Sequence, residues 1–256
     1  DEIQSYPHLL TMLKFLNQEG RYRYIASGSQ LGIALSKSTS VPLGSVEIQR
    51  MFPLDFEEFL WAMGVGKEAI RSMRKSFEAR EPLNESTHDY IMKLFRYYLL
   101  VGGLPDAVNQ FVADRNMVKV RQIQADVHEL YGIDASQYDE ENKLKIRKVY
   151  DMIPSQLENK KKRIIVKNIE HKAGKQYSDY ENEFEYLIQA AIALDTNAIS
   201  NPRFPLSESV VKNLLKLYIN DVGILTQILY DYNVNAILND ECSINLGTVY
   251  ESVVAQ

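Results

Sequence analysis

The sequence is poor in cysteine and has no long apolar run. Cys242 is the only cysteine among the 256 residues, so no internal disulfide can form and we expect a reducing, cytoplasmic environment. No apolar run approaches the roughly 18 residues that a membrane-spanning helix requires. The first residues, Asp1-Glu2, do not resemble a secretory signal, which begins with a basic and then an apolar stretch. We therefore predict a soluble protein without a membrane partner.

Zinc-ligand spacing and the usual nucleophile motifs are also missing. The four histidines are scattered along the chain, and none has a second ligand at the spacing of a zinc site. The sequence contains no Gly-x-Ser-x-Gly string, and no histidine lies near Cys242 in sequence. These absences argue against a zinc site and against a hydrolase with a nucleophilic serine or cysteine.

Charge is unevenly distributed along a chain whose formal net charge is −5. Residues 143–175 contain eleven basic and three acidic residues, a local net charge of +8. A basic segment in an acidic chain predicts an anionic partner at one place, and DNA is the partner that we consider. The candidate phosphate contacts are Lys160, Lys161, Lys162 and Arg163, although a charge run is more often a solvated loop. Both interpretations stay open, and no residue can be assigned to base recognition.

The first part of the chain has the pattern of an α/β fold. Residues 7–18 have one apolar stripe and begin with Pro7, which predicts a helix that Gly20 can end. Residues 21–27 and 46–51 are rich in β-forming side chains and are predicted strands. An acidic pair, a helix, a strand and a polar turn in this order are typical of a sheet with parallel strands.

The middle of the chain is predicted to be helical. Asp55 can cap a helix, and Glu58 stands three residues later, as in a capping box. Gly64 and Gly66 would end that helix. A later helix is lined by tyrosines, and the glycine-proline string at residues 102–105 ends it and starts the next.

The second half predicts a winged-helix-like module. Residues 143–152 and 180–194 have helical patterns, and residues 195–200 and 214–220 can form two strands of a hairpin, or wing. The order helix, short helix, helix and β-hairpin is that of a winged helix. We therefore predict three parts: residues 1–75 as the end of an ATPase domain, 76–135 as a helical lid or connector, and 136–256 as the winged-helix-like domain.

The acidic pair Asp1-Glu2 is a candidate catalytic site. In P-loop ATPases the first carboxylate of such a pair holds hydrated Mg²⁺, and the second orients the attacking water. The alternative is a chance dipeptide, since short motifs often match by chance. The next predicted strand ends at Ser27 and is followed by Ser29, and a polar residue there would lie beside the acidic pair and contact the γ-phosphate or the water.

Five short motifs follow one another at intervals that resemble those of a known family. They are Asp1-Glu2-Ile3-Gln4, Ser27-Gly28-Ser29, the string at residues 53–59, the string at residues 102–105 and the string at residues 216–225. In these motifs the chain resembles the prokaryotic AAA+-like P-loop ATPases, close to the archaeal ATPase group, that carry a C-terminal domain of unknown function. The resemblance implies that Asp1 and Glu2 are the Walker B pair, with Asp1 on the metal. It also implies that Ser29 or Ser27 is the sensor-like residue and that ATP and Mg²⁺ bind the parent protein.

The sequence departs from that family at several points. The Gly-rich phosphate loop ending in Gly-Lys-Ser/Thr does not occur, and the string at residues 64–68 has Glu68 where the hydroxyl is needed. The family also tends to have an arginine where Ser45 stands, and Arg50 is a poor substitute. Residues 246–256 resemble the helix that opens a nuclease-like fold in relatives. Within this chain Glu251 is expected to be a structural helix residue, because the other metal ligands of such a fold are absent.

The sequence therefore predicts an α/β part followed by a mostly helical region with a winged-helix-like module. The favoured function is that of a fragment of an AAA+-like ATPase that starts at the Walker B pair, is inactive alone and is cut before a nuclease-like segment. One alternative is a DNA-binding winged-helix regulator, and another is a truncated, non-functional gene product. Self-association or a protein partner also remains open.

Overall fold

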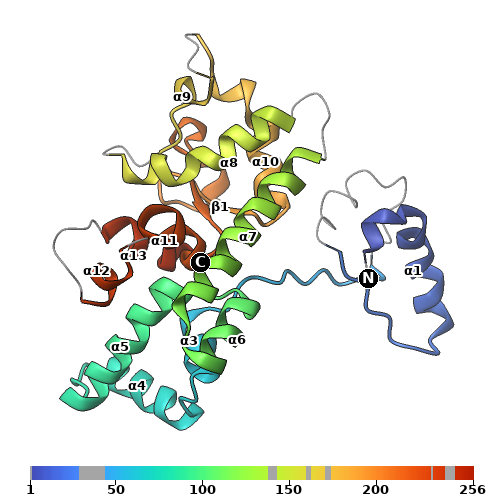
Figure 1. Cartoon of the computed structure of the whole chain (residues 1–256). Coiled ribbons are helices and arrows are strands. Elements are labelled where there is room, and N and C mark those ends of the chain that lie inside the picture. Colours follow the sequence, from blue (N-terminus) through green and yellow to red (C-terminus); the bar gives the residue numbers. More distant parts are fainter. Residues whose placement is uncertain are drawn as a thin grey trace.

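The computed structural model describes residues 2–28, 44–137, 143–159, 163–170, 174–231, 233–239 and 246–256. These residues are mostly helical, with one small two-stranded sheet (Figure 1). Figure 1 shows the N-terminal segment apart from a helical body, joined to it by an extended stretch. Asp1 and Ser29 lie outside the described residues, as do Lys160, Lys161 and Lys162. Residues 31–35, whose sequence predicts a short helix, also lie outside them.

The N-terminal segment is one helix and the chain that folds back along it. A 3₁₀ turn, η1 (Ile3–Ser5), leads into α1 (Pro7–Glu19), which has Pro7 in its first turn. Gly20 ends α1 with φ 67°, a left-handed conformation that glycine adopts at little cost. Ile3 and Leu10 form a small separate apolar cluster. The predicted helix and its glycine stop are confirmed.

The two strands predicted near the N-terminus are not strands in the structure. Residues 21–22 are a bend, and neither residues 21–27 nor residues 46–51 are paired in a ladder. A strand requires a neighbour that accepts and donates a series of backbone hydrogen bonds, whereas the Ser27 carbonyl accepts the Ile3 N–H without a ladder on either side. β-propensity alone is therefore not sufficient to form these strands.

The helical body is built from a succession of packed helices. The first helix, α3, begins with the predicted capping box: the Glu58 N–H donates to the Asp55 side chain at 2.8 Å, and the Asp55 N–H donates to Glu58 at 3.0 Å. The helices of this part are α3 (Phe56–Ala62), α4 (Lys67–Ala79), α5 (Glu85–Val101), α6 (Pro105–Asp114), α7 (Met117–Gln137) and α8 (Lys143–Glu158).

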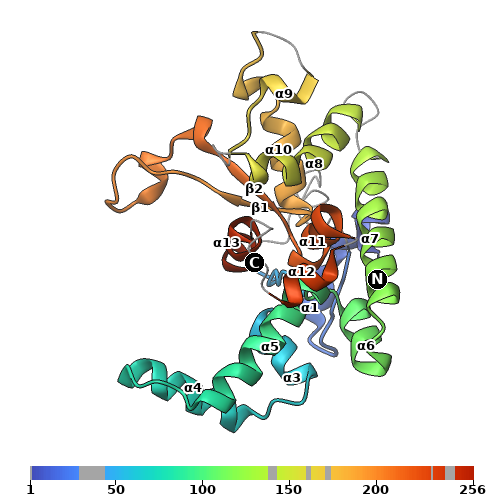
Figure 2. The same cartoon turned by 60° about the vertical axis from the view of Figure 1, so that its left-hand side comes forward.

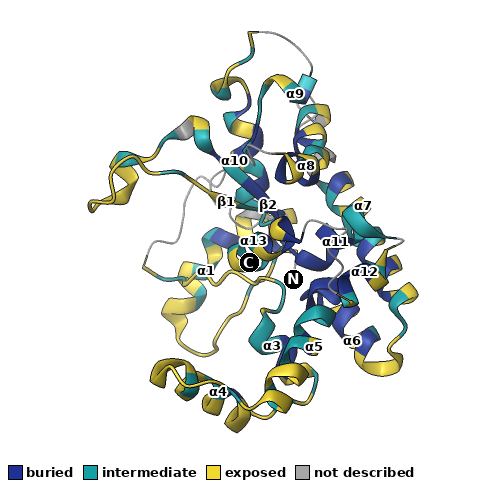
Figure 3. Ribbon diagram, turned by 90° about the vertical axis from the view of Figure 1, so that its left-hand side faces the viewer, coloured by how far each residue is buried: buried dark blue, intermediate teal, exposed yellow. Residues whose placement is uncertain are grey.

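The C-terminal part adds short helices around the small sheet. Its elements are α9 (Lys167–Glu170), η2 (Tyr177–Asp179), α10 (Glu181–Gln189), β1 (Ala193–Thr196), η3 (Leu206–Ser209), η4 (Lys212–Leu214), β2 (Lys216–Ile219), α11 (Val222–Tyr230), α12 (Val234–Leu238) and α13 (Gly247–Ala255). One hydrophobic core runs from Phe59 to Val249. Figure 3 shows α11 largely buried and α4 largely exposed.

The sheet is an antiparallel pair that ends in a projecting hairpin. Ala193 is opposite Ile219 and Thr196 is opposite Lys216. Beyond the pair, an isolated bridge joins Ile199 to Val210, and the chain between them projects from the body (Figure 2). The predicted hairpin is confirmed, with β1 and β2 shifted from the predicted bounds. Residues 153–157, whose sequence predicts the short helix of the winged-helix order, belong instead to α8, so that order stays a prediction.

Two predicted helix boundaries are wrong. The helix predicted to end at Met152 continues to Glu158 with Pro154 inside it. The helix predicted to reach Leu194 ends at Gln189, because residues from Ile192 onward belong to the sheet region: the Asn220 N–H donates to the Ile192 carbonyl at 3.3 Å. Sheet pairing thus overrides the helical periodicity of the sequence.

Across the described ranges, no helix combines the length and the apolar character that a membrane span would need.

Candidate functional site

The structure brings two of the predicted catalytic segments together. The Ile3 N–H donates to the Ser27 carbonyl at 3.1 Å, so the backbone after Glu2 lies beside the segment that ends at Ser27. Both Glu2 and Ser27 are exposed. This is the neighbour relation that the sequence predicted, although no strand ladder supports it. The catalytic roles of these residues stay a prediction.

The described residues do not by themselves form a nucleotide site. The sequence has no Gly-x-x-x-x-Gly-Lys-Ser/Thr loop, whose backbone amides would surround the phosphates. Among the described residues, no three His, Cys, Asp or Glu side chains are grouped to hold a metal ion. Glu2 and Ser27 thus supply one carboxylate and one hydroxyl, and this set does not fit ATP and Mg²⁺ without further residues.

Three of the sequence motifs meet in a partly buried arrangement that we call the motif joint, made of residues 53–56, 102–105 and 220–223. The Leu54 N–H donates to the Gly103 carbonyl at 2.8 Å. The Tyr98 hydroxyl donates to the Leu54 carbonyl at 2.9 Å, and the Gln256 amide donates to the same oxygen at 3.3 Å. Both backbone groups of Leu54 are therefore satisfied by the helical body.

A buried carboxylate is the centre of the motif joint. Asp221 is fully buried, and one of its oxygens accepts the Gly103 N–H at 2.6 Å. The other oxygen accepts the Ile224 N–H at 3.0 Å, so Asp221 is also the N-cap of α11. Burial raises the pKa of Asp221 to about 6, although backbone N–H donors oppose that rise. Burial and the nearby Asp221 charge also raise the pKa of Tyr98, which therefore stays a neutral donor.

The glycines of the motif joint are required by close approach. A Cβ on Gly102 would lie 2.2 Å from an oxygen of Asp221, and Gly102 also has φ 67°. A Cβ on Gly103 would lie 2.0 Å from the Leu54 carbonyl oxygen. Since these neighbours are a buried carboxylate and backbone, neither can move aside easily. The Gly102-Gly103 pair is thus a packing requirement as well as a helix stop.

A second polar network, which the sequence did not reveal, caps the end of α5. Arg121 is buried, and its Nη1 donates to the Leu100 carbonyl at 3.3 Å and to Thr226 Oγ1 at 3.0 Å. Gln124 donates to the Leu100 and Val101 carbonyls at 2.8 and 2.9 Å. A helix leaves its last carbonyls without partners, and a cation there is favourable. Burial lowers the pKa of Arg121 to about 10, where the guanidinium is still charged at neutral pH.

The predicted DNA-binding cluster is only partly described. Arg163 is half-buried, and the three lysines before it lie outside the described residues. Within the surrounding basic segment, Arg147 forms ion pairs with Glu129 at 3.1 Å and Asp151 at 2.9 Å. Part of the local positive charge is therefore neutralised, whereas Lys148 and Lys167 are exposed.

Glu251 has the structural role that the sequence predicted. Its carboxylate lies 3.3 Å from the Lys216 ammonium, which joins α13 to β2. The pair is only partly exposed, so it links two packed elements.

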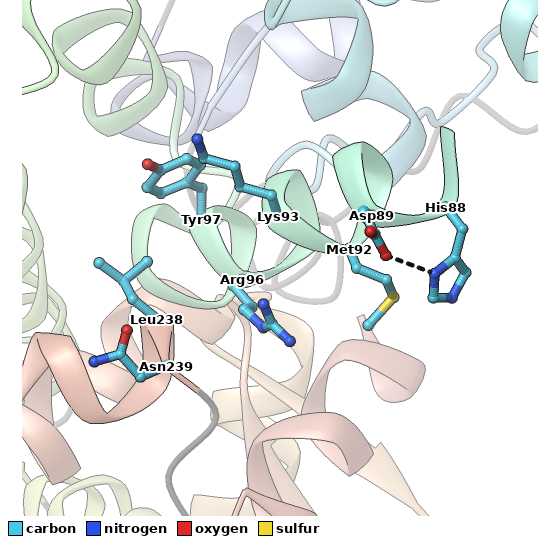
Figure 4. Close-up of a pocket in the computed structure, with 8 residues that line it drawn as sticks. All are labelled: His88, Asp89, Met92, Lys93, Arg96, Tyr97, Leu238 and Asn239. Carbon is cyan, nitrogen blue, oxygen red and sulfur yellow. Dashed lines mark hydrogen bonds and ion pairs between the residues drawn. The ribbon is translucent and has the colours of Figure 1, made fainter. Parts of the chain in front are cut away.

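A surface pocket of about 580 Å³ lies between α5 and α12. It is lined by His88, Asp89, Met92, Lys93, Arg96, Tyr97, Leu238 and Asn239. Figure 4 shows Lys93 and Arg96 leaving α5 in different directions, while His88 contacts Asp89 at 3.3 Å. The cations thus do not converge on one point, and the pocket has no arrangement of groups that indicates a reaction.

We predict that Gly103→Ala lowers the free energy of unfolding by about 3 kcal/mol, because the new methyl group overlaps the Leu54 backbone. Gly66→Ala is the matched control, since a Cβ on Gly66 meets nothing within 4 Å. Urea denaturation followed by circular dichroism measures both. Equal midpoints for the two variants would contradict the close approach.

Asp221→Asn should change how stability depends on pH. Because the folded-state pKa of about 6 lies above the ordinary 3.8, Asp221 contributes stability that is fully present below about pH 3.8 and is lost as pH rises through about 6. The unfolding free energy of the parent should therefore fall relative to Asp221→Asn between about pH 4 and pH 7, by up to about 3 kcal/mol. A difference between the two proteins that is constant over this range would be inconsistent with a raised pKa.

Two family models together match most of the chain. Residues 1–60 match the model of the AAA domain, which supports an AAA-type P-loop ATPase fragment. Residues 92–233 match the Domain of unknown function (DUF8612). Searches of curated proteins and of solved structures found no significant match. Since the second match covers more than half of the chain, the protein belongs to the DUF8612 domain family and carries an AAA domain match at its N-terminal end.

Proposed function

We propose that this chain is part of an ATP-driven molecular switch of the archaeal-ATPase type. The observation that carries the proposal is the AAA domain match over residues 1–60, within which the backbone after Glu2 is hydrogen-bonded to Ser27. In P-loop ATPases the acidic pair and a polar sensor residue must lie side by side at the γ-phosphate. The Ile3–Ser27 hydrogen bond is consistent with that requirement.

The proposed roles follow from the chemistry of each group. As a Walker B pair, Asp1 would hold hydrated Mg²⁺, and Glu2 would accept a proton from the attacking water. Ser29 or Ser27 would detect whether the γ-phosphate is present. The phosphate-binding loop is not in this sequence, so the proposed site requires phosphate-binding groups that this chain does not supply, and we expect this chain alone to be inactive.

The motif joint connects the end of the AAA-matched residues to the helical body. Leu54 belongs to the AAA match, whereas Gly103 and Asp221 belong to the DUF8612 match. The hydrogen bonds of the half-buried Leu54 to Gly103 and Tyr98 therefore connect the two matched regions. We propose that a nucleotide-dependent displacement of residues 1–60 is transmitted through this connection.

The test is made on the complete natural protein. Glu2→Gln should keep Mg²⁺-ATP binding in calorimetry and slow hydrolysis by about 100-fold or more, because a general base is lost. Glu19→Gln, an exposed carboxylate at the end of α1, is the control and should hydrolyse ATP at the parent rate. If the natural protein binds no ATP, or if Glu2→Gln hydrolyses ATP normally, the proposal is wrong.

A second candidate function is DNA binding by a winged-helix module. The observation that favours it is the projecting hairpin after α8, α9 and α10, next to the basic segment at residues 143–175. In that arrangement Lys160, Lys161, Lys162 and Arg163 would contact phosphates, and the hairpin would be the wing.

Replacing those four cations by glutamine tests the second candidate. Each duplex phosphate contact contributes about −0.9 to the slope of log affinity against log salt. If all four cations contact phosphate, the slope for a short DNA duplex should become shallower by about 3.6. A variant that binds duplex DNA at low salt as tightly as the parent would remove this candidate.

A further inference from the structure

Helix α4 (Lys67–Ala79) is an arm that projects from the body in Figures 2 and 3. It is anchored by Ile70, which is buried with Leu60 and Leu94, and by the partly buried Met73. Its remaining side chains are exposed except for the half-buried Ser76. The helix thus has one attached face, and the other faces are open to solvent.

The open side of α4 carries a line of cations. Lys67, Arg71, Arg74 and Lys75 follow the spacing i, i+4, i+7 and i+8, which places them on one face at 3.6 residues per turn. We call this set the α4 basic stripe. All four are exposed, and the side chains of Arg71 and Arg74 are 68% and 66% exposed. Carboxylates lie beside the stripe: Glu68 pairs with Arg71, Glu57 pairs with Arg74 at 3.1 Å, and Glu78 is exposed.

These ion pairs leave the stripe available to a polyanion. Exposed pairs of this kind contribute little free energy, so phosphates can displace them readily. Lys75 has no ion-pair partner among the described residues, and the Lys67 ammonium lies 5.4 Å from the centre of the Trp61 ring. Residues 67–80 contain five basic and two acidic residues in a chain whose net charge is −5. The stripe is therefore a positive region in an acidic protein.

Two exposed aromatic side chains flank the α4 basic stripe. Trp61 is 42% exposed and lies against Lys67 at one end. Phe77 is 84% exposed and stands one turn beyond Arg74, at the other end. At 1.5 Å per residue, Lys67 and Phe77 are separated by about 15 Å along the helix. Cations between aromatic platforms are the combination that binds single-stranded nucleic acid, because phosphates meet the cations and bases stack on the rings.

A membrane surface fits this helix less well. An amphipathic helix binds lipid by burying its apolar face in the bilayer. The apolar face of α4 is already packed, since Ile70 and Met73 contact α3 and α5, and only Phe77 remains free. We propose that the α4 basic stripe, with Trp61 and Phe77, is a docking surface for single-stranded nucleic acid. This surface is separate from the basic segment at residues 143–175.

Binding of a fluorescent single-stranded oligothymidine to the full chain tests the proposal. Arg71→Gln combined with Lys75→Gln should make the salt dependence of log affinity shallower by about 1.4, because each single-strand phosphate contact contributes about 0.7. Phe77→Ala should weaken binding about tenfold without changing that slope, since it removes stacking and no charge. Lys14→Gln combined with Arg23→Gln is the control, because it removes one exposed lysine and one exposed arginine outside both basic regions and should leave both quantities unchanged.

Several outcomes would overturn the proposal. No binding by the parent, or an unchanged salt slope for the α4 double variant, would remove the surface. An equal effect of the control would show that net charge matters and the stripe does not. Equal affinity for duplex DNA together with no effect of Phe77→Ala would exclude stacking of bases. Binding to vesicles that contain phosphatidylserine, with no binding to the oligonucleotide, would assign the helix to a membrane surface instead.

Discussion

The architecture of the helical body depends on one buried carboxylate. Asp221 accepts N–H groups from Gly103 and Ile224, so one side chain fixes the break between α5 and α6 and also begins α11. Gly103 in turn accepts the Leu54 N–H, which attaches the start of α3 to the same place. Because an unpaired buried charge is very costly, these partners are held together as a set. Elements more than a hundred residues apart in sequence are thereby joined through one group.

The sequence predicted the elements whose signals are local. The Asp55–Glu58 capping box, the Gly20 stop and the break at Gly102 each depend on neighbouring residues, and each is present in the structure. The hairpin predicted from residues 195–200 and 214–220 is likewise present, with shifted bounds. The spatial contact between the motifs was not predictable. Nothing in the sequence around Asp221 indicates that its carboxylate accepts the N–H of Gly103, which lies 118 residues earlier.

The features that the sequence analysis did not predict depend on tertiary contacts, which cannot be read from a single sequence. Arg121 has the pattern of an ordinary helix-surface cation, yet it is buried against carbonyls at the end of α5 and the Thr226 hydroxyl. Residues 21–27 and 46–51 have strand composition, but a ladder requires a paired strand that the described residues do not provide. For the candidate catalytic site, the chain supplies the contact between the segments that follow Glu2 and end at Ser27. The residues that would surround a phosphate are not in the sequence.

The central claim is that the motif joint holds Leu54, near the end of the AAA-matched residues, rigidly to the DUF8612 region, which transmission through that end requires. Native-state hydrogen exchange of the Leu54 and Gly103 amides tests it most directly, with the amide of the buried Tyr218, which pairs with Leu194 in the sheet, as reference. If the joint is rigid, the Leu54 and Gly103 amides will open with the same free energy as Tyr218, because all three are released only when the helical body unfolds. Rapid exchange at Leu54 while Tyr218 stays protected would show that the two regions separate easily, and would contradict the account.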